Sequence, residues 1–336
     1  MATIGAYDGL HLGHRKLLDS VLGRASEENL PSVVMSFEPT PKEFFAADSP
    51  PARLMRFREK FDALAAAGVD IFFCPRFDER MRRIAADDFI RQLLIHAMNV
   101  RRLVIGDDFR FAAGRSGTVG QLERAGRALG FEVRQEGSVV VGGRRVSSTA
   151  IRQALWTGNL ALATRLLGRH YSMSGKVIAG DGLGRELGYP TANVNLRRRQ
   201  SAVMGIFAAR VRGVAGQPLD AVASVGTRPT FGGTKPLLEV HIFDFDADIY
   251  GEYIQVDFIA RIRSEEKFEN AKALVEHGCT VLGIEIDVAL VARGQLGADR
   301  PGPLLLPDDV ALPLDAGGDE GGARVVGRPV DVGDGD

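Results

Sequence analysis

The chain has 336 residues, 45% hydrophobic and 25% charged, which is typical of a globular protein long enough for two domains with substantial cores. Its formal net charge of −1 provides no bulk attraction for nucleic acid or an anionic membrane, so phosphate groups would have to be bound by a few local arginines and backbone N–H groups. Its two cysteines show no metal-binding or redox spacing, and no apolar run reaches the ~20 residues of a membrane helix, which favours a cytoplasmic protein without zinc or disulfides.

The first half alternates short apolar strands with amphipathic helical segments. Such alternation predicts a parallel sheet with right-handed crossovers. Strands are predicted at 2–5, 32–37, 70–74, 101–106 and around 131–136, and helices at 14–29, 57–68, 86–99, 118–130 and 147–168.

After Gly168 the pattern changes to short strands separated by glycine, proline and aspartate turns, which predicts a small antiparallel barrel or sandwich. A further helix is predicted from Glu265. The segment 294–336 is rich in glycine, aspartate and proline and contains neither lysine nor an aromatic ring. That composition cannot offset the entropy of ordering, so this tail is predicted to be disordered. The strands are predicted within 171–182, 205–214, 219–226, 237–245 and 252–262.

The stretch GAYDGLHLGH (5–14) joins the first predicted strand to the first helix. In an open α/β sheet, ligands bind outside the carboxyl ends of the strands, which is where this stretch lies. Its glycines allow close approach of the backbone, and a helix N-terminus presents unpaired N–H groups to an anion. His11 and His14 would face the same place, which favours stabilisation of charge developing on a nucleotide phosphate. The alternatives are a helix cap and part of a metal site.

At this stretch the sequence resembles a known family. The form G-x-[FY]-D-G-x-H-x-G-H is similar to the HxGH signature of nucleotidylyltransferases and, at full length, to bacterial bifunctional riboflavin kinases/FMN adenylyltransferases. Six further motifs follow in the family's order: SFEPTPKEFF, VIGDDFRFAAGRSG, SSTAIRQAL, GDGLGRELGYPTAN, SVGTRPTF and LEVHIFDFDADIYG. The resemblance implies a Rossmann-like nucleotidylyltransferase domain at 1–168, a β-barrel flavokinase domain at 169–293 and the disordered tail at 294–336.

The resemblance implies two reactions on small molecules. The second domain would phosphorylate riboflavin to FMN, and the first would join FMN to the α-phosphorus of ATP, giving FAD and pyrophosphate. Both would use ATP and Mg²⁺. No G-x-x-x-x-G-K-[ST] motif occurs, so the kinase would not be a P-loop enzyme.

For the adenylyl-transfer site, the family's positions fall on residues of three motifs. SSTAIR could also be only a helix N-cap, and the aromatic residues after the fourth strand could be ordinary core packing. Residues expected at ATP and its phosphates are Gly5, Asp8, His11, His14, Ser148, Thr149 and Arg152. Residues expected on the flavin side are Asp108, Phe109, Phe111 and Arg115, with Arg115 meeting the FMN phosphate.

For the kinase site, the glycines Gly180 and Gly182 are expected in a flap over the phosphates. Thr191 and Asn193 would supply oxygen ligands to Mg²⁺, which prefers few protein oxygens together with phosphates and water. Glu239 matches the family's general base for the riboflavin 5′-hydroxyl. Without the resemblance, an acid at this place would be read as the polar face of an alternating strand.

The sequence also departs from the family's pattern. Met1 lies almost on the first motif, Tyr7 replaces the more usual phenylalanine, and Thr40 stands where the family often has histidine. After about Glu276 the expected closing helix gives way to the tail, a pattern that a reading-frame shift would produce. The oligomeric state is not indicated.

Three alternatives remain open. The first is a flavin-binding protein that has lost one or both activities through its altered termini. The second is a fragment of a class I aminoacyl-tRNA synthetase, since those enzymes share His-x-Gly-His and SMSGK (172–176) imitates a second motif of theirs. The third is a single-activity adenylyltransferase for another phosphate ester. The net charge speaks against the second, and the flavokinase-like second half against the third.

Overall fold

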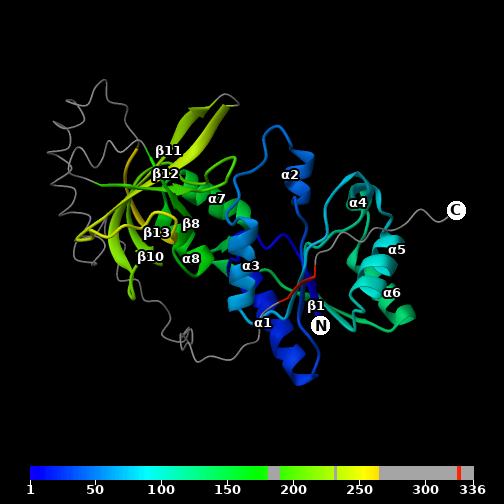
Figure 1. Ribbon diagram of the computed structural model, residues 1–336. Helices are drawn as coiled ribbons and strands as arrows, with labels where there is room; N and C mark the ends of the chain where they lie inside the picture. The colour runs from blue at the N-terminus through cyan, green and yellow to red at the C-terminus, as the bar shows by residue number, and fades with distance from the viewer. Residues whose placement is uncertain (181–189, 231–232, 265–323, 327–336) are drawn as a thin grey trace. The chain divides into compact units, whose positions relative to one another are not determined.

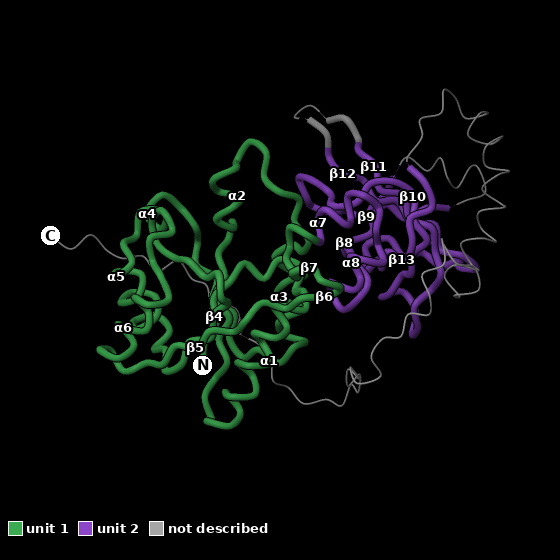
Figure 2. The backbone as a smooth tube through the Cα atoms, turned by 180° about the vertical axis from the view of Figure 1, so that it is seen from behind, with its two compact units in different colours: residues 1–150, 321–336 green, residues 151–320 purple. Residues whose placement is uncertain are grey.

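The fold divides after Ala150, where the first of two compact units ends and the second begins with Ile151 (Figure 1, Figure 2). The computed structural model describes residues 1–180, 190–230, 233–264 and 324–326. The helix predicted from Glu265, Gly182 and most of the tail at 294–336 lie outside these residues. From the tail, the strand Arg324–Val326 is described and belongs to the first unit.

A parallel sheet forms the centre of the first unit, in the order β14-β3-β2-β1-β4-β5. Every residue of β1 and β2 is buried, as expected for strands covered on both faces. The chain runs outward from β1 first in one direction and then, from β4, in the other, so the order reverses between β1 and β4. The strands are β1 (Ala2–Ile4), β2 (Val33–Met35), β3 (Ile71–Phe73), β4 (Arg102–Gly106), β5 (Glu132–Glu136) and β14 (Arg324–Val326).

The helices predicted at 14–29, 57–68 and 118–130 lie within two residues of the observed bounds, whereas the predicted helix 86–99 is a short α-helix followed by a π-helix. The short helices at 41–45 and 79–83 were not predicted. Helix α6 starts after Thr118, whose side chain accepts from the backbone N–H of Gln121, and ends at Gly130 with φ 82°. The elements are α1 (Leu12–Glu27), α2 (Pro41–Phe45), α3 (Phe57–Ala66), α4 (Glu79–Arg83), α5 (Ala86–Asp88), η1 (Phe89–Ala97), η2 (Ala113–Arg115) and α6 (Val119–Leu129), with a small hairpin of β6 (Val140–Val141) and β7 (Arg144–Arg145).

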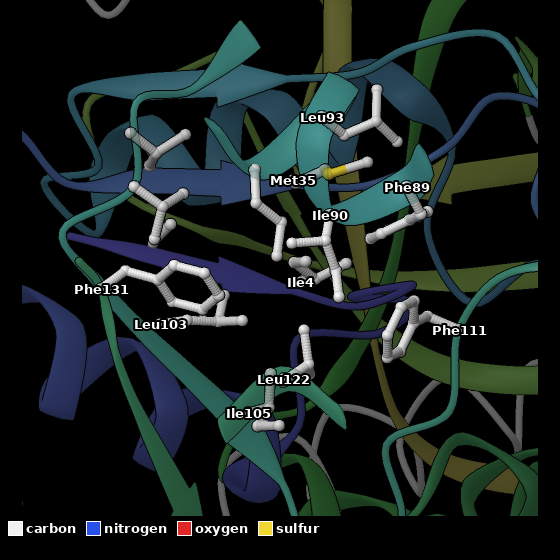
Figure 3. Packing of buried hydrophobic residues seen from close by; sticks show 14 residues of the cluster. Ile4, Met35, Phe89, Ile90, Leu93, Leu103, Ile105, Phe111, Leu122 and Phe131 are labelled. Carbon is white, nitrogen blue, oxygen red and sulfur yellow. The ribbon is translucent and has the colours of Figure 1, made fainter. Parts of the chain in front are cut away.

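The core lies on both faces of the sheet because successive strand residues point to opposite sides. On one face Ile4 and Met35 pack with residues of η1 and α6 (Figure 3). On the other face Val34 and Phe72 pack with α1 and α3. The predicted α/β architecture of the first half is therefore confirmed.

The helix predicted over 147–168 is in fact two helices, α7 (Ser148–Trp156) and α8 (Leu160–Leu167). Gly158 adopts φ 77° between them, and the Asn159 side chain caps α8 by accepting from the backbone N–H of Leu162 at 2.9 Å. Helix α8 contacts β8 and β13 and so packs with the second unit.

The second unit is a closed antiparallel barrel in the order β10-β11-β12-β9-β8-β13. Its interior contains Tyr171, Phe207 and Phe258, with the ring of Phe207 edge-on to that of Phe258 at 5.1 Å. This confirms the predicted barrel. Its strands are β8 (Tyr171–Ile178), β9 (Ala192–Asn195), β10 (Gly205–Arg212), β11 (Leu219–Thr230), β12 (Gly233–Ile242) and β13 (Tyr253–Arg263).

Two glycines within helices provide a stability test. A Cβ at Gly126 in α6 would overlap the backbone oxygen of Phe131, whereas a Cβ at the exposed Gly23 in α1 would meet nothing within 4 Å. We expect Gly126→Ala to lower the free energy of unfolding by about 1–3 kcal/mol through overpacking. Gly23→Ala should raise it by about 0.5–1 kcal/mol, the helix preference for alanine. Urea unfolding of both variants measures the difference, and equal effects would contradict the packing described for α6.

Candidate active sites

The first candidate site lies where the strand order of the parallel sheet reverses. The stretch 5–11 leaves the carboxyl end of β1, and 107–111 leaves the carboxyl end of the neighbouring β4. Loops that diverge from adjacent strands at such a point leave a crevice, which is the usual ligand site of open α/β sheets. The fold thus brings the HxGH stretch and the GDDFRF stretch to one edge.

His11 and His14 are held together by the start of α1. His11 is the N-cap, and its Nδ1 accepts from the backbone N–H of His14 at 3.3 Å. The two rings are stacked with centroids 3.6 Å apart and planes 12° apart. A Cβ on Gly13 would lie 3.3 Å from the His11 ring, so glycine leaves the room that this ring occupies. The spacing of three residues thus lets His11 cap the helix and also places its imidazole against that of His14.

The surroundings of His14 favour the neutral form of its imidazole. Burial lowers its pKa well below the ordinary value, and the nearby His11 and Lys60 lower it further. The residue keeps part of its surface exposed, but its Nδ1 is buried and has no hydrogen-bond partner among the described residues. An unsatisfied buried nitrogen of this kind is costly unless a ligand or water satisfies it. The Nδ1 of His14 is therefore a buried polar atom whose hydrogen bond the described residues do not supply.

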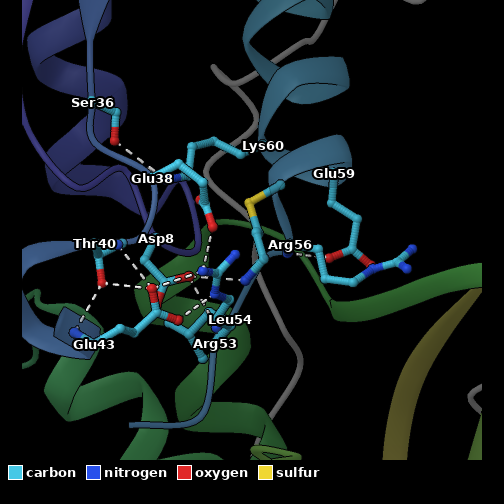
Figure 4. A network of polar contacts seen from close by, with 11 residues as sticks. Asp8, Ser36, Glu38, Thr40, Glu43, Arg53, Leu54, Arg56, Glu59 and Lys60 are labelled. Atoms are coloured by element: carbon cyan, nitrogen blue, oxygen red, sulfur yellow. Dashed lines mark hydrogen bonds and ion pairs between the residues drawn. The ribbon is translucent and has the colours of Figure 1, made fainter. Parts of the chain in front are cut away.

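Asp8 shapes the loop through its carboxylate. Its Oδ1 accepts from the backbone N–H groups of Leu54 (Figure 4) and Met55, both at 2.9 Å. Its backbone oxygen accepts from the Ser148 hydroxyl at 2.9 Å. A Cβ on Gly5 would lie 3.1 Å from the Tyr7 ring, so Gly5 also acts on the shape of this loop. These contacts assign Asp8, Gly5 and Ser148 to the framework of the site.

Thr149 and Arg152 follow Ser148 in α7. Thr149 lies in the first unit next to the Ser147 cap, whose hydroxyl accepts from the backbone N–H of Ala150 at 3.2 Å. Arg152 belongs to the second unit.

The sequence did not point to a polar network behind the loop. Arg53 binds Glu43 through two hydrogen bonds and Glu38 at 2.5 Å, and the Thr40 side chain caps α2 in a reciprocal box with Glu43 (Figure 4). Burial alone would raise the pKa of Glu43, but the hydrogen bonds from Arg53 and Thr40 lower it overall. Thr40, which departs from the family's usual histidine, therefore has a structural role in this chain.

Lys60 was also missed by the sequence analysis. It is 3% exposed in α3, on the face that carries Phe57, Phe61 and Leu64. Its Nζ donates to the Ser36 hydroxyl at 3.3 Å. A lysine at helical spacing from three apolar residues was the signal that could have found it, since a solvent-facing lysine would stand on the opposite face.

The flavin-side residues follow β4. Asp108 forms an ion pair with Arg145 at 2.8 Å, and the Phe109 and Phe111 rings stack at 5.9 Å. Phe111 is 5% exposed and packs in the core against Phe89, whereas Phe109 is half-buried. Arg115 is exposed at the end of η2. Of the two rings, Phe109 is thus the one with surface left for a ligand.

The second candidate site is a row of oxygen-bearing side chains across three strands of the barrel. Glu239 of β12 is in register with Asn193 of β9 and with Ser224 of β11. Their neighbours Leu238, Val240 and Val194 are buried in the barrel. Since side chains alternate along a strand, the Glu239 row lies on the outer, half-exposed face.

Further residues surround this row. Gly180 lies so close to the Asn193 amide that a Cβ would overlap it, and Thr191 immediately precedes β9. The Nδ1 of His241, on the same face as Glu239, lies 2.9 Å from the carbonyl oxygen of Pro190. The structure thus brings Gly180, Thr191, Asn193 and Glu239 to one patch of the barrel.

Within the described ranges, no three or more His, Cys, Asp or Glu side chains gather in a way that could hold a metal ion. Every helix in the same ranges is too short or too polar to cross a bilayer.

Comparisons with known proteins match both units. The family model for FAD synthetase matches residues 1–150, and that for riboflavin kinase matches residues 167–279. The bifunctional riboflavin kinase/FMN adenylyltransferase of Escherichia coli (strain K12) is 48% identical over 272 residues, covering 81% of this chain and 87% of that protein. The protein of the same name from Haemophilus influenzae (strain Rd) is 44% identical over 266 residues, covering 79% of this chain and 86% of that protein.

A solved structure shares the fold. A crystal structure described as a macrolide-efflux protein from Streptococcus pneumoniae superposes with a TM-score of 0.71 at 31% identity, covering 87% of this chain and 93% of that one. The two chains thus share a fold.

The role of Asp8 can be tested at the two amides it binds. Asp8→Ala removes the acceptor of two backbone N–H groups, and we expect a loss of about 2 kcal/mol in the free energy of unfolding. Asp8→Asn keeps an oxygen at the same place and should lose less. Hydrogen exchange at the Leu54 and Met55 amides measures the contact directly. Equal protection of both amides in Asp8→Ala and the unchanged protein would contradict it.

Proposed function

The chain belongs to the family of bifunctional riboflavin kinases/FMN adenylyltransferases, and from that membership we propose which of its residues carry each of the two reactions. The enzyme phosphorylates riboflavin to FMN and adenylylates FMN to FAD. In the proposed division, adenylyl transfer takes place in the first unit and phosphoryl transfer on the barrel. Both reactions consume ATP, and the proposal places them in the cytoplasm, where ATP is supplied.

In adenylyl transfer, an oxygen of the FMN phosphate attacks the α-phosphorus of ATP. The bond from that phosphorus to the bridging oxygen breaks, and pyrophosphate leaves with the electron pair. No covalent intermediate with the protein is needed, so the protein positions the groups and neutralises charge. We assign this work to His11 and His14. A neutral imidazole at His14 can take up a proton when phosphate approaches and then donate to its oxygens, and the amino end of α1 adds N–H groups.

The two sides of the crevice are assigned to the two substrates. Gly5, Asp8, Ser148 and Thr149 form the ATP side in this proposal, supported by the link from Ser148 to the loop of Asp8. Arg152 stays a prediction from the family's motif.

On the flavin side, Phe109 would contact the isoalloxazine, with Phe111 backing it from the core. Asp108 would hydrogen-bond the flavin, and Arg115 would meet the FMN phosphate. The exposed position of Arg115 and the half-buried ring of Phe109 are compatible with these roles.

In phosphoryl transfer, Glu239 is proposed to accept the proton of the riboflavin 5′-hydroxyl. The freed oxygen attacks the γ-phosphorus of ATP, and ADP leaves. The Glu239 side chain is half-exposed on the outer face of the barrel. Gly180 and Gly182 are proposed to border the phosphates. His241 is assigned no chemical step in this proposal. Its contact with the carbonyl oxygen of Pro190 supports the segment before β9.

The kinase reaction uses Mg²⁺ in this proposal, and the residues present fit that ion. Asn193 is in register with Glu239, and Thr191 immediately precedes β9. The Thr191 hydroxyl and the Asn193 amide oxygen are hard oxygen ligands, and two of them suit an ion that takes few ligands from the protein. Bound there with the ATP phosphates, the ion would neutralise charge on the transferred group.

One observation carries the proposed division: the histidine pair and the Glu239 row lie in different compact units, each matched by a different family model. The test is chromatography of the purified protein after incubation with riboflavin, ATP and Mg²⁺, with and without EDTA. Formation of FMN and then FAD, abolished by EDTA, is the expected result. Tight flavin binding with no ATP-dependent product would instead favour a flavin-binding protein that has lost its activities.

His14→Ala should separate the reactions. We expect FAD formation from FMN to fall by about 10²-fold or more, because charge stabilisation at the transferred phosphoryl group is lost. FMN formation from riboflavin should be unchanged. His96→Ala, at an exposed histidine of η1, is the matched control and should leave both rates as they are. Loss of both activities, or of neither, in His14→Ala would contradict the division.

Glu239→Gln should have the opposite effect. The amide cannot accept the hydroxyl proton, so FMN formation should fall by about 10²–10⁴-fold, while FAD formation from supplied FMN continues. Glu252→Gln, at an exposed glutamate of the same unit, serves as control. Riboflavin phosphorylation at the unchanged rate in Glu239→Gln would show that another group accepts the proton.

A further inference from the structure

A buried lysine lies beneath the loop of the adenylyl-transfer site. Lys60 is 3% exposed and lies on the face of α3 that carries Leu64, which belongs to an apolar cluster with Tyr7 and Phe72. Lysine is almost never buried unless its charge is compensated. Among the described residues its hydrogen-bond partner is the neutral hydroxyl of Ser36. The burial of this charge therefore calls for an explanation beyond packing.

The contacts of Lys60 lead to the first motif. Its Nζ donates to the Ser36 hydroxyl (Figure 4). That hydroxyl in turn donates to the backbone oxygen of Ala6 at 3.3 Å. Gly5, the preceding residue, is fixed by its N–H to Met35 at 3.0 Å. The ammonium group is thus the far end of a hydrogen-bonded chain that reaches the loop between β1 and α1.

We propose that Lys60 is a positioning residue for adenylyl transfer, holding the Gly5–Asp8 loop from below through Ser36 and adding a buried positive charge behind the two histidines. It acts through the loop and through its field. The inference rests on the assignment of adenylyl transfer to this unit.

The charges around Lys60 and His14 support this role. Burial lowers the pKa of Lys60, while Asp8, Cys74 and Glu38 raise it and Arg53 lowers it, so several groups act on one buried ammonium.

For His14, burial is the first cause of its low pKa, and His11 from its own helix and Lys60 from α3 add to it. The Tyr7 ring, at 4.9 Å, also faces His14, and burial raises the pKa of its hydroxyl so that it stays uncharged. The positive charge of Lys60 therefore disfavours protonation of the His14 imidazole. The same charge attracts a triphosphate.

The experiment uses the full chain with Lys60→Met, which removes the charge and keeps the length of the side chain. We expect kcat/KM for ATP in FAD formation to fall by about tenfold. The imidazole of His14, followed by NMR in labelled protein without substrate, should titrate at higher pH because a neighbouring positive charge has gone. FMN formation on the barrel is the internal measure of folding and should be unchanged.

Three further variants make the test decisive. Leu64→Met, one turn along the same buried face, controls for a disturbed core and should change neither measurement. Lys60→Arg keeps the charge and should leave the titration of His14 in place. Ser36→Ala keeps the charge of Lys60 but breaks the hydrogen-bonded chain to Ala6. It should therefore lower the rate of FAD formation without shifting the titration of His14. This variant also tests the loop role if Lys60→Met does not fold.

The outcomes are distinct. An unmoved His14 titration in Lys60→Met contradicts the electrostatic role, and unchanged FAD formation in Ser36→Ala contradicts the loop role. If the wild-type protein makes no FAD at all, the assignment of adenylyl transfer to this unit is wrong. The NMR titration of His14 still decides in that case whether Lys60 acts on the imidazole, because the titration requires no turnover.

Discussion

The hydrogen bonds from the backbone N–H groups of Leu54 and Met55 to the Asp8 carboxylate fix the conformation of the loop on which the first site is built. The loop that carries Asp8 is strained: Tyr7, Gly9 and Leu10 have φ values of 48°, 92° and 43°. For residues with a side chain, such conformations cost of the order of 1 kcal/mol or more each, and they persist only where surrounding contacts hold them. The Asp8 bonds and the hydrogen bond between Tyr7 and Thr3 at 2.7 Å supply those contacts. Without them the loop could relax.

That constraint fixes the state of the imidazoles as well. A held loop places His11 as the cap of α1 and stacks His14 on it, in surroundings that disfavour a charged ring. The charges nearby are arranged in two ways. Arg53 is paired with Glu38 and Glu43, so it stabilises the framework of the loop. Lys60 is instead hydrogen-bonded to the neutral Ser36 hydroxyl, and the carboxylates of Asp8 and Glu38 act on its charge. Charges in a low-dielectric interior interact more strongly than charges in water.

Local sequence signals were sufficient to predict the sheet, the barrel and the position of the histidine pair. Runs such as Val33–Met35 are apolar on both faces, and the motif of glycines and histidines follows directly from a strand. What could not be predicted depends on distant partners. Asp8 binds backbone groups 46 and 47 positions away, and Glu38 and Arg53 are 15 positions apart, with no pattern that pairs them. The break between α7 and α8 at Gly158 was missed for another reason. The apolar spacing typical of a helix continues across that glycine.

The barrel site shows the same limit in a different form. Alternation along β12 predicts that Glu239 is on one face and Leu238 and Val240 on the other, but only the register tells which residues of β9 and β11 stand beside it. A shift of one residue would bury the carboxylate and expose two core side chains that are 0% and 1% exposed. The apolar interior therefore selects the register, and the register places Asn193 and Ser224 next to the acid. The geometry of this polar row on the surface is thus a consequence of packing inside the barrel.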